Sequence, residues 1–160
     1  MNKIEKIPTG NYDLLIEQIS TLMADAKKRV ATAVNDTLVD TYWNIGKYIV
    51  EFEQEGNTRA KYGEQLLVNL SKDLTNRLGK GFSKSNLFNM RLFYSRFPIF
   101  QALPGKLGWT HLVEIIRIED ELERNFYLAE AVNANWSSRE LIKQKEKGLF
   151  LQLALGKKKG

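Results

Sequence analysis

The feature that most constrains the fold is a stripe of apolar side chains with helical spacing in the first third of the chain. From Tyr12 to Thr37 these side chains alternate at intervals of four and three residues, which is the spacing of a coiled-coil seam. The stripe then slips by one residue and continues from Leu38 to Phe52. The pattern predicts one very long helix, or two helices joined near Asn35, that ends before Gly56. The members of the first stretch are Tyr12, Ile16, Ile19, Met23, Ala26, Val30, Ala33 and Thr37.

A helix of this length cannot bury its whole stripe within a small domain. We therefore expect part of it to pack on a second copy of the chain, as a homodimer. The small members Ala26, Ala33 and Thr37 favour the alternative of close packing within one chain. The candidate dimerisation residues are Ile16, Ile19, Met23 and Val30.

The next segment has the layout of a helix-turn-helix. Residues 61–78 carry apolar side chains at helical spacing, and Gly79-Lys80-Gly81 then stops the helix, because glycine accepts the left-handed backbone of a helix exit. Ser83 is a natural N-cap for a third helix that ends before Pro98. A helix, a short glycine turn and a capped helix form this motif in many DNA-binding proteins.

The remainder of the chain predicts further short helices. Residues 97–109 hold two prolines and two glycines, so they predict a loop or a short β-wing. Helices follow over 110–117 and 120–135, and a last one begins at the capping box that opens with Ser137. The predicted fold is all-α, a long N-terminal helix plus a helix-turn-helix bundle with a winged-helix-like variant. The predicted domains are a helical arm (11–60), a helix-turn-helix-like domain (61–150) and a basic tail (151–160), with a single domain over 11–150 as the alternative.

Composition narrows the class of protein. The absence of cysteine excludes disulfides, thiolate metal sites and thiol catalysis. No apolar run approaches the length of a membrane span, and the N-terminus lacks the apolar core of a signal peptide. We therefore expect a cytoplasmic protein without a membrane partner.

The net charge of +5 is unevenly distributed along the chain. Residues 61–107 carry 8 basic and 2 acidic side chains, a net charge of +6. A segregated basic patch is typical of surfaces that bind polyanions. The alternative is a solvated basic face with no partner.

The third helix carries the predicted contacts with nucleic acid. Its helical wheel places Leu87, Met90, Tyr94 and Phe97 on the core face, although Phe88 and Leu92 lie near the opposite, outward face. Asn, Ser, Arg and Lys are the residue types that reach base edges and phosphates. The predicted base-reading residues are Ser85, Asn89 and Arg96, and the predicted phosphate contacts are Lys72, Arg77, Lys80, Lys84 and Arg91.

Catalytic residue types are scarce. His111 is the single histidine, so one chain cannot build a two-histidine metal site, and beside Trp109 it is expected to be a structural hydrogen-bonding group. The acidic residues from Glu119 to Glu123 lie at a helix start, where they complement the helix dipole. We expect no cofactor, no metal and no catalytic centre.

Several strings, in this order and spacing, resemble the N-terminal domain of the YhcG-type nuclease family. They are Tyr42-Trp43-Asn44-Ile45-Gly46-Lys47, Gly79-Lys80-Gly81-Phe82-Ser83, Trp109-Thr110-His111-Leu112, Arg124-Asn125-Phe126-Tyr127 and Trp136-Ser137. The resemblance covers residues 11–149. It implies a helical domain with a winged-helix-like role in DNA binding, which precedes a C-terminal nuclease domain of the PD-(D/E)xK superfamily in full-length relatives.

Two functions follow from the sequence. The first is a non-catalytic DNA-binding module that positions a nuclease domain on DNA. The alternative is a protein–protein interaction or dimerisation module with no direct contact to nucleic acid.

Overall fold

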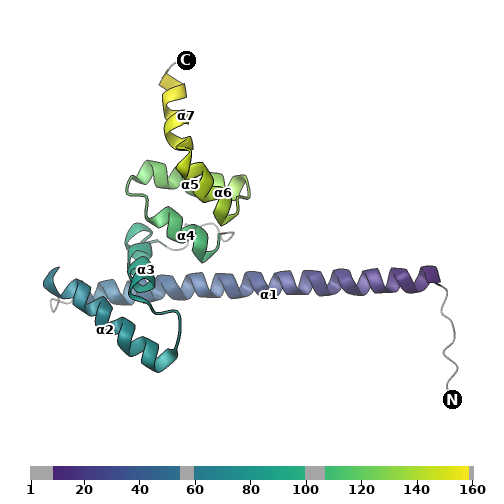
Figure 1. Ribbon diagram of the computed structural model, residues 1–160, viewed down its shortest axis with the longest axis horizontal. Coiled ribbons are helices and arrows are strands. Elements are labelled where there is room, and N and C mark those ends of the chain that lie inside the picture. Colours follow the sequence, from purple (N-terminus) through teal and green to yellow (C-terminus); the bar gives the residue numbers. More distant parts are fainter. Residues whose placement is uncertain (1–8, 55–59, 100–106, 159–160) are drawn as a thin grey trace. The chain divides into compact units, whose positions relative to one another are not determined.

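The computed structural model describes residues 9–54, 60–99 and 107–158, and within them it contains seven helices and no strand (Figure 1). The all-α class and the long N-terminal helix predicted from the sequence are confirmed. Of residues 97–109, where a loop or a short β-wing was predicted, residues 100–106 lie outside the described residues. The helices are α1 (Thr9–Phe52), α2 (Ala60–Leu78), α3 (Lys84–Arg96), α4 (Trp109–Ile116), α5 (Glu121–Asn133), α6 (Ser138–Glu146) and α7 (Leu149–Lys158).

Helix α1 is a single uninterrupted helix of 44 residues that belongs to two structural units. The chain divides into residues 1–37 and residues 38–160. The division lies within α1. The reason is that Val39 and Ile49, in the last part of α1, are buried in the core of the second unit.

The core of the second unit is organised around α3, which lies between α2 and α4 (Figure 1). Leu87, Met90 and Phe93 of α3 are completely buried. Leu87 and Met90 pack with Ile49 of α1 and Leu67 of α2, whereas Phe93 packs with the apolar side chains of α4, α5 and α6. Helix α3 therefore joins two apolar clusters and has neighbours on more than one side.

Helices α1 and α3 approach each other closely at Gly46. A Cβ atom at this position would overlap the carbonyl oxygen of Met90 and would lie 2.8 Å from its carbonyl carbon and 3.1 Å from Cβ of Tyr94. Only a residue without a side chain fits between these two backbones. Trp43, one turn earlier on α1, packs edge-on against the Tyr94 ring at 5.2 Å and donates a 2.7 Å hydrogen bond to the carbonyl of Phe97.

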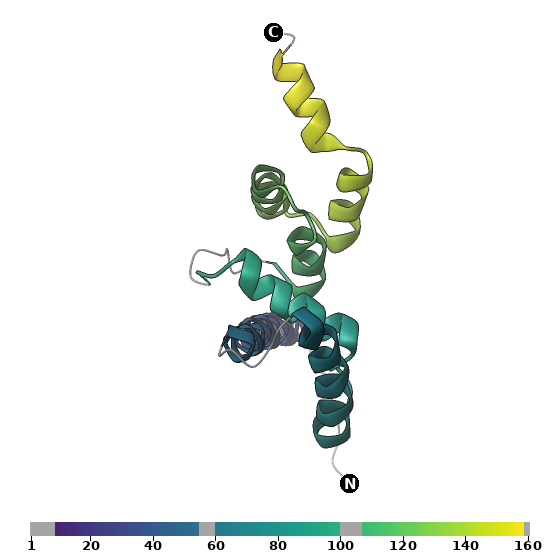
Figure 2. The ribbon, with the colours of Figure 1, turned by 90° about the vertical axis from the view of Figure 1, so that its left-hand side faces the viewer.

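Helices α4, α5 and α6 complete the second unit through buried side chains such as Ile115, Tyr127 and Leu141. The predicted N-cap of α6 is confirmed, because the Ser137 hydroxyl accepts a hydrogen bond from Glu140 N at 3.1 Å. One last helix was predicted from Ser137 onward, whereas the structure has two helices there, α6 and α7. Gly148 adopts a φ of +68° and separates α6 from α7, whose far end projects beyond α5 and α6 (Figure 2).

Candidate nucleic-acid interface

The turn between α2 and α3 is built by two glycines and one cap. Gly79 and Gly81 have φ values of +94° and +110°, a region that side-chain-bearing residues rarely occupy. The Ser83 hydroxyl then accepts a hydrogen bond from Asn86 N at 3.1 Å and caps α3. The helix, glycine turn and capped helix predicted from the sequence are therefore present.

Asn86 holds this turn against α4, a role that the sequence analysis missed. Its Nδ2 donates to the carbonyl of Gly81 at 2.6 Å, and its Oδ1 accepts from Nε1 of Trp109 at 3.0 Å. An asparagine in the first turn of a helix commonly satisfies local backbone groups, so the first hydrogen bond could have been expected. The second depends on the position of α4, which no local pattern reveals.

Four of the predicted phosphate-contacting residues are exposed cations. Lys72, Arg77, Lys80 and Lys84 are all exposed, and none has an ion-pair partner among the residues that the structure describes. Arg77, Lys80 and Lys84 lie within eight residues, from the end of α2 to the start of α3, and Ser85 beside them is also exposed. Lys72 lies five residues before Arg77, which is about 140° around an α-helix. The turn therefore groups three cations, and Lys72 faces a different direction.

Asn89, one of the predicted base-reading residues, is buried. The residue is only 5% exposed within one chain. It precedes Phe93 by one helical turn and so lies on the same face as that buried ring. The helical wheel placed it outside because it took the apolar stripe as the only buried face of α3.

Arg91 and Arg96 are engaged within the protein. Arg91 Nη1 forms a 3.2 Å ion pair with Oε1 of Glu53, with both side chains about three-quarters buried. Arg96 Nε donates to the carbonyl of Ile116 at 3.3 Å and so ties α3 to the end of α4. Their predicted contacts with nucleic acid would compete with these interactions.

The outward face of α3 also presents an aromatic ring. Phe88 is 45% exposed, and the Arg91 guanidinium lies 5.7 Å from its ring centroid. Leu92 is half-buried against the larger apolar cluster. Of these two apolar residues of the predicted outward face, Phe88 is therefore exposed within one chain, while Leu92 packs inside.

The ionisable groups in the interior have structural roles. His111 accepts a hydrogen bond from Gly108 N at Nδ1, so its Nε2 carries the proton and donates to the Trp136 carbonyl at 2.8 Å. Buried Arg124 donates through Nη1 to the carbonyls of Ile118 and Glu119. Burial, with a smaller effect of the Arg96 guanidinium, lowers the pKa of Arg124. No group of three or more potential metal ligands occurs in the described ranges 9–54, 60–99 and 107–158.

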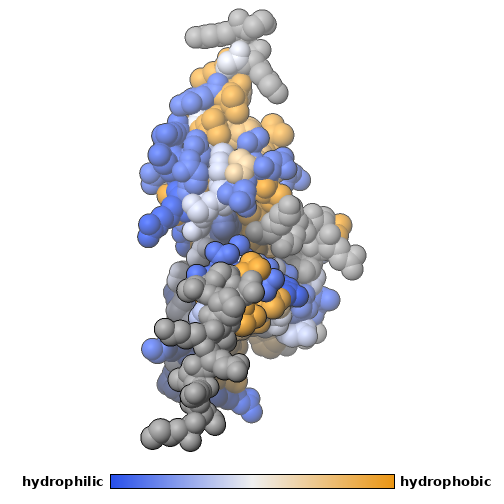
Figure 3. All heavy atoms as spheres, turned by 90° about the vertical axis from the view of Figure 1, so that its right-hand side faces the viewer, coloured by the Kyte–Doolittle hydropathy of each residue, from blue (hydrophilic) through white to orange (hydrophobic). Residues whose placement is uncertain are grey.

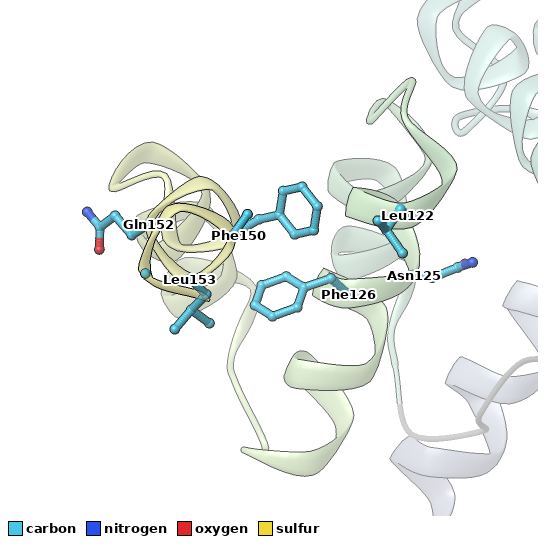
Figure 4. Close-up of a pocket in the computed structure, with 8 residues that line it drawn as sticks. Leu122, Asn125, Phe126, Phe150, Gln152 and Leu153 are labelled. Carbon is cyan, nitrogen blue, oxygen red and sulfur yellow. The ribbon is translucent and has the colours of Figure 1, made fainter. Parts of the chain in front are cut away.

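Two apolar surfaces lie outside this interface. In the first unit, the candidate dimerisation residues Ile16, Ile19, Met23 and Val30 are 46–63% exposed. In the second unit, Figure 3 shows apolar atoms gathered over α7. There Phe126 of α5 faces Phe150 of α7 at 5.3 Å across a groove of about 730 Å³, with Leu122 and Leu153 on its walls (Figure 4).

The fold and this surface define a small helical domain with an exposed basic turn. Residues 18–152 match the model of the DUF1016 N-terminal domain, and the chain belongs to this family. The chain is 33% identical over 176 residues to a protein of Escherichia coli (strain K12) named "Putative nuclease YhcG". The alignment covers 90% of this chain but 47% of that relative, so the chain spans about half of its length. The family expected from the sequence motifs is confirmed.

No solved structure matches the chain. No helix in the described part of the chain is long and apolar enough to cross a membrane.

Proposed function

We propose that this domain binds DNA through the α2–α3 turn and thereby positions a nuclease domain on its substrate. The observation that carries the proposal is the group of exposed cations at the turn, Arg77, Lys80 and Lys84, which lack ion-pair partners among the described residues. Lysine and arginine side chains that are not neutralised by neighbouring carboxylates are available to phosphates. The relative's name, which describes a nuclease, supports a polyanionic partner.

The geometry divides the predicted contacts into two kinds. Arg77, Lys80 and Lys84 contact phosphates, and Ser85, in the first turn of α3, reaches toward the bases. Exposed Phe88 adds a ring on which an unpaired base can stack, which favours DNA with single-stranded character. Because Asn89 is buried, little is left to read a base sequence, so the domain recognises DNA form more than sequence.

The experiment is a fluorescence anisotropy titration with a labelled duplex, a single strand and a branched junction over a range of salt concentrations. The Lys80→Glu/Lys84→Glu variant should bind all three more weakly. Loss of two phosphate contacts should make the plot of the log binding constant against log salt concentration less steep, by about 2 for the duplex and by less for the single strand. The matched control, Lys143→Glu/Lys147→Glu, makes the same change of net charge at exposed positions on and after α6.

Equal weakening by both variants would show that binding depends on total charge and not on this turn. No binding by the unmodified protein at low salt would leave the turn as a solvated face and would refute the proposal. A Phe88→Ala variant that loses affinity for the single strand but not for the duplex would support the stacking role.

A further inference from the structure

The first part of α1 presents apolar side chains that no described part of the chain covers. Ile16, Ile19 and Met23 are between 46% and 55% exposed, which is the exposure of a helix without a neighbour on that face. Their spacing of three and four residues is that of a seam between two helices. A stripe of this kind, rimmed by charged residues, fits a helical partner with matching spacing.

We propose that residues 12–30 of α1 pair with the same segment of a second copy in an antiparallel arrangement. The proposal is independent of nucleic-acid binding and rests on two properties of the segment: the sizes of its seam residues and the positions of two opposite charges.

The sizes of the seam residues fit an antiparallel pairing. In one register, Tyr12 faces Val30 of the second copy, Ile16 faces Ala26, and Ile19 faces Met23. Each layer then combines residues of complementary or similar size. In a parallel pair every residue faces its own copy, which sets Ala26 against Ala26 and leaves a thin layer between wide ones.

The flanking charges select the same register. Asp13 and Lys27 are exposed and occupy the same position of the heptad, beside the seam, two heptads apart. When the copies are antiparallel with Ile19 opposite Met23, Asp13 of each copy lies beside Lys27 of the other. The dimer thus contains two opposite-charge pairs related by its twofold axis. In a parallel pair the corresponding flanking contacts are Leu15 with Ser20, Leu22 with Lys27, and Arg29 with Val34, none of which pairs opposite charges.

The first test is the oligomeric state. We expect a dimer by analytical ultracentrifugation at tens of micromolar protein. Replacing Ile19 with asparagine affects the seam twice per dimer, so it should raise the dissociation constant at least a hundredfold. At about 1.4 kcal/mol per tenfold change, this factor corresponds to a loss of about 3 kcal/mol or more in the free energy of dimerisation. The matched control is Leu14→Asn, since Leu14 is equally exposed but lies about 140° around the helix from Ile19. Because both side chains are exposed, neither substitution should unfold the chain, which circular dichroism can verify.

The second test addresses the register by charge reversal. Asp13→Lys or Lys27→Asp alone creates two like-charge pairs and should weaken the dimer roughly tenfold. The double variant restores two attractive pairs and should return to within about threefold of the unmodified dimer. Asp25→Lys is the control, because Asp25 is exposed on the outer side of the helix, away from the seam.

The third test addresses orientation, and the absence of cysteine makes single-site labelling straightforward. A spin label at Asp36→Cys should give an inter-label distance of roughly 45 Å in the antiparallel dimer, because each label lies about 15 residues beyond the twofold axis and each residue adds about 1.5 Å. A parallel dimer would give less than about 20 Å. A label at Ser20→Cys gives a short distance in both arrangements and reports labelling and dimerisation.

A monomer at these concentrations would overturn the proposal. So would a short distance at position 36, or a double charge variant that is no stronger than the single ones. Equal effects of Ile19→Asn and Leu14→Asn would also contradict it, because only the first residue lies in the proposed seam.

Discussion

The contact between α1 and α3 at Gly46 makes an unusual prediction for a glycine within a helix. Replacing a mid-helix glycine with alanine ordinarily stabilises a protein, by about 1 kcal/mol from helix propensity. At Gly46 the new methyl group would overlap the backbone carbonyl of Met90 and approach Cβ of Tyr94 to 3.1 Å. Neither atom belongs to the end of a flexible side chain, so the two helices must separate.

The expected magnitude follows from these opposing effects. Overpacking a core costs about 1 to 3 kcal/mol, and a backbone overlap belongs at or above the upper end. After the gain in helix propensity is subtracted from this cost, Gly46→Ala should lower the free energy of unfolding by about 2 kcal/mol. For a chain of this size that corresponds to a fall in the melting temperature of roughly 4 to 8 °C.

Urea unfolding followed by tryptophan fluorescence measures this change, because Trp43 and Trp109 both pack in the affected unit. The control is Gly156→Ala in α7, where a Cβ atom would meet nothing within 4 Å and the substitution should be neutral or slightly stabilising. If Gly46→Ala were as stable as the unmodified protein, the close crossing of α1 and α3 would be wrong.

Three further substitutions test the local structure by urea unfolding. Asn86→Ala removes the hydrogen bonds of Asn86 to Gly81 and Trp109 and should lower the free energy of unfolding by about 2 kcal/mol. An unchanged stability would show that the position of Trp109 does not depend on Asn86. His111→Phe keeps the ring but leaves two backbone groups without their partner, and we expect a loss of about 1 to 3 kcal/mol at neutral pH. Gly148→Ala forces alanine into a φ of +68° and should cost about 1 to 2 kcal/mol, whereas an increase in stability would indicate that α6 and α7 join into one helix.

Local signals in the sequence predicted most of the helices, because caps and breakers act through their immediate neighbours. Ser83 and Ser137 marked two helix starts correctly, and Gly79 marked a helix end. The break at Gly148 was missed because good helix-forming residues flank it, so only its backbone conformation reveals the turn.

The candidate site was less predictable, because it depends on which sides of α3 are covered. A helical wheel assigns one buried face, but α3 packs on α2 and α4 at once, and its buried arc extends past Phe93 to Asn89. The engagement of Arg91 by Glu53 likewise joins residues 38 positions apart. The exposed cations at the turn were predictable since short-range geometry alone places them outside.

The continuity of α1 has a consequence for how its first part becomes ordered. An isolated helix must first form a nucleus, which is unfavourable, while extending an existing helix is nearly neutral for each added residue. Residues 38–52 are held by their packing in the second unit, so they supply the nucleus for the rest of α1. The residues before Thr37 can therefore become helical by propagation toward the N-terminus, without a core of their own. At protein concentrations too low for the proposed dimer to form, amide hydrogen exchange should show protection that decreases steadily from Leu38 back toward Tyr12, as the cost of fraying falls with distance from the packed segment.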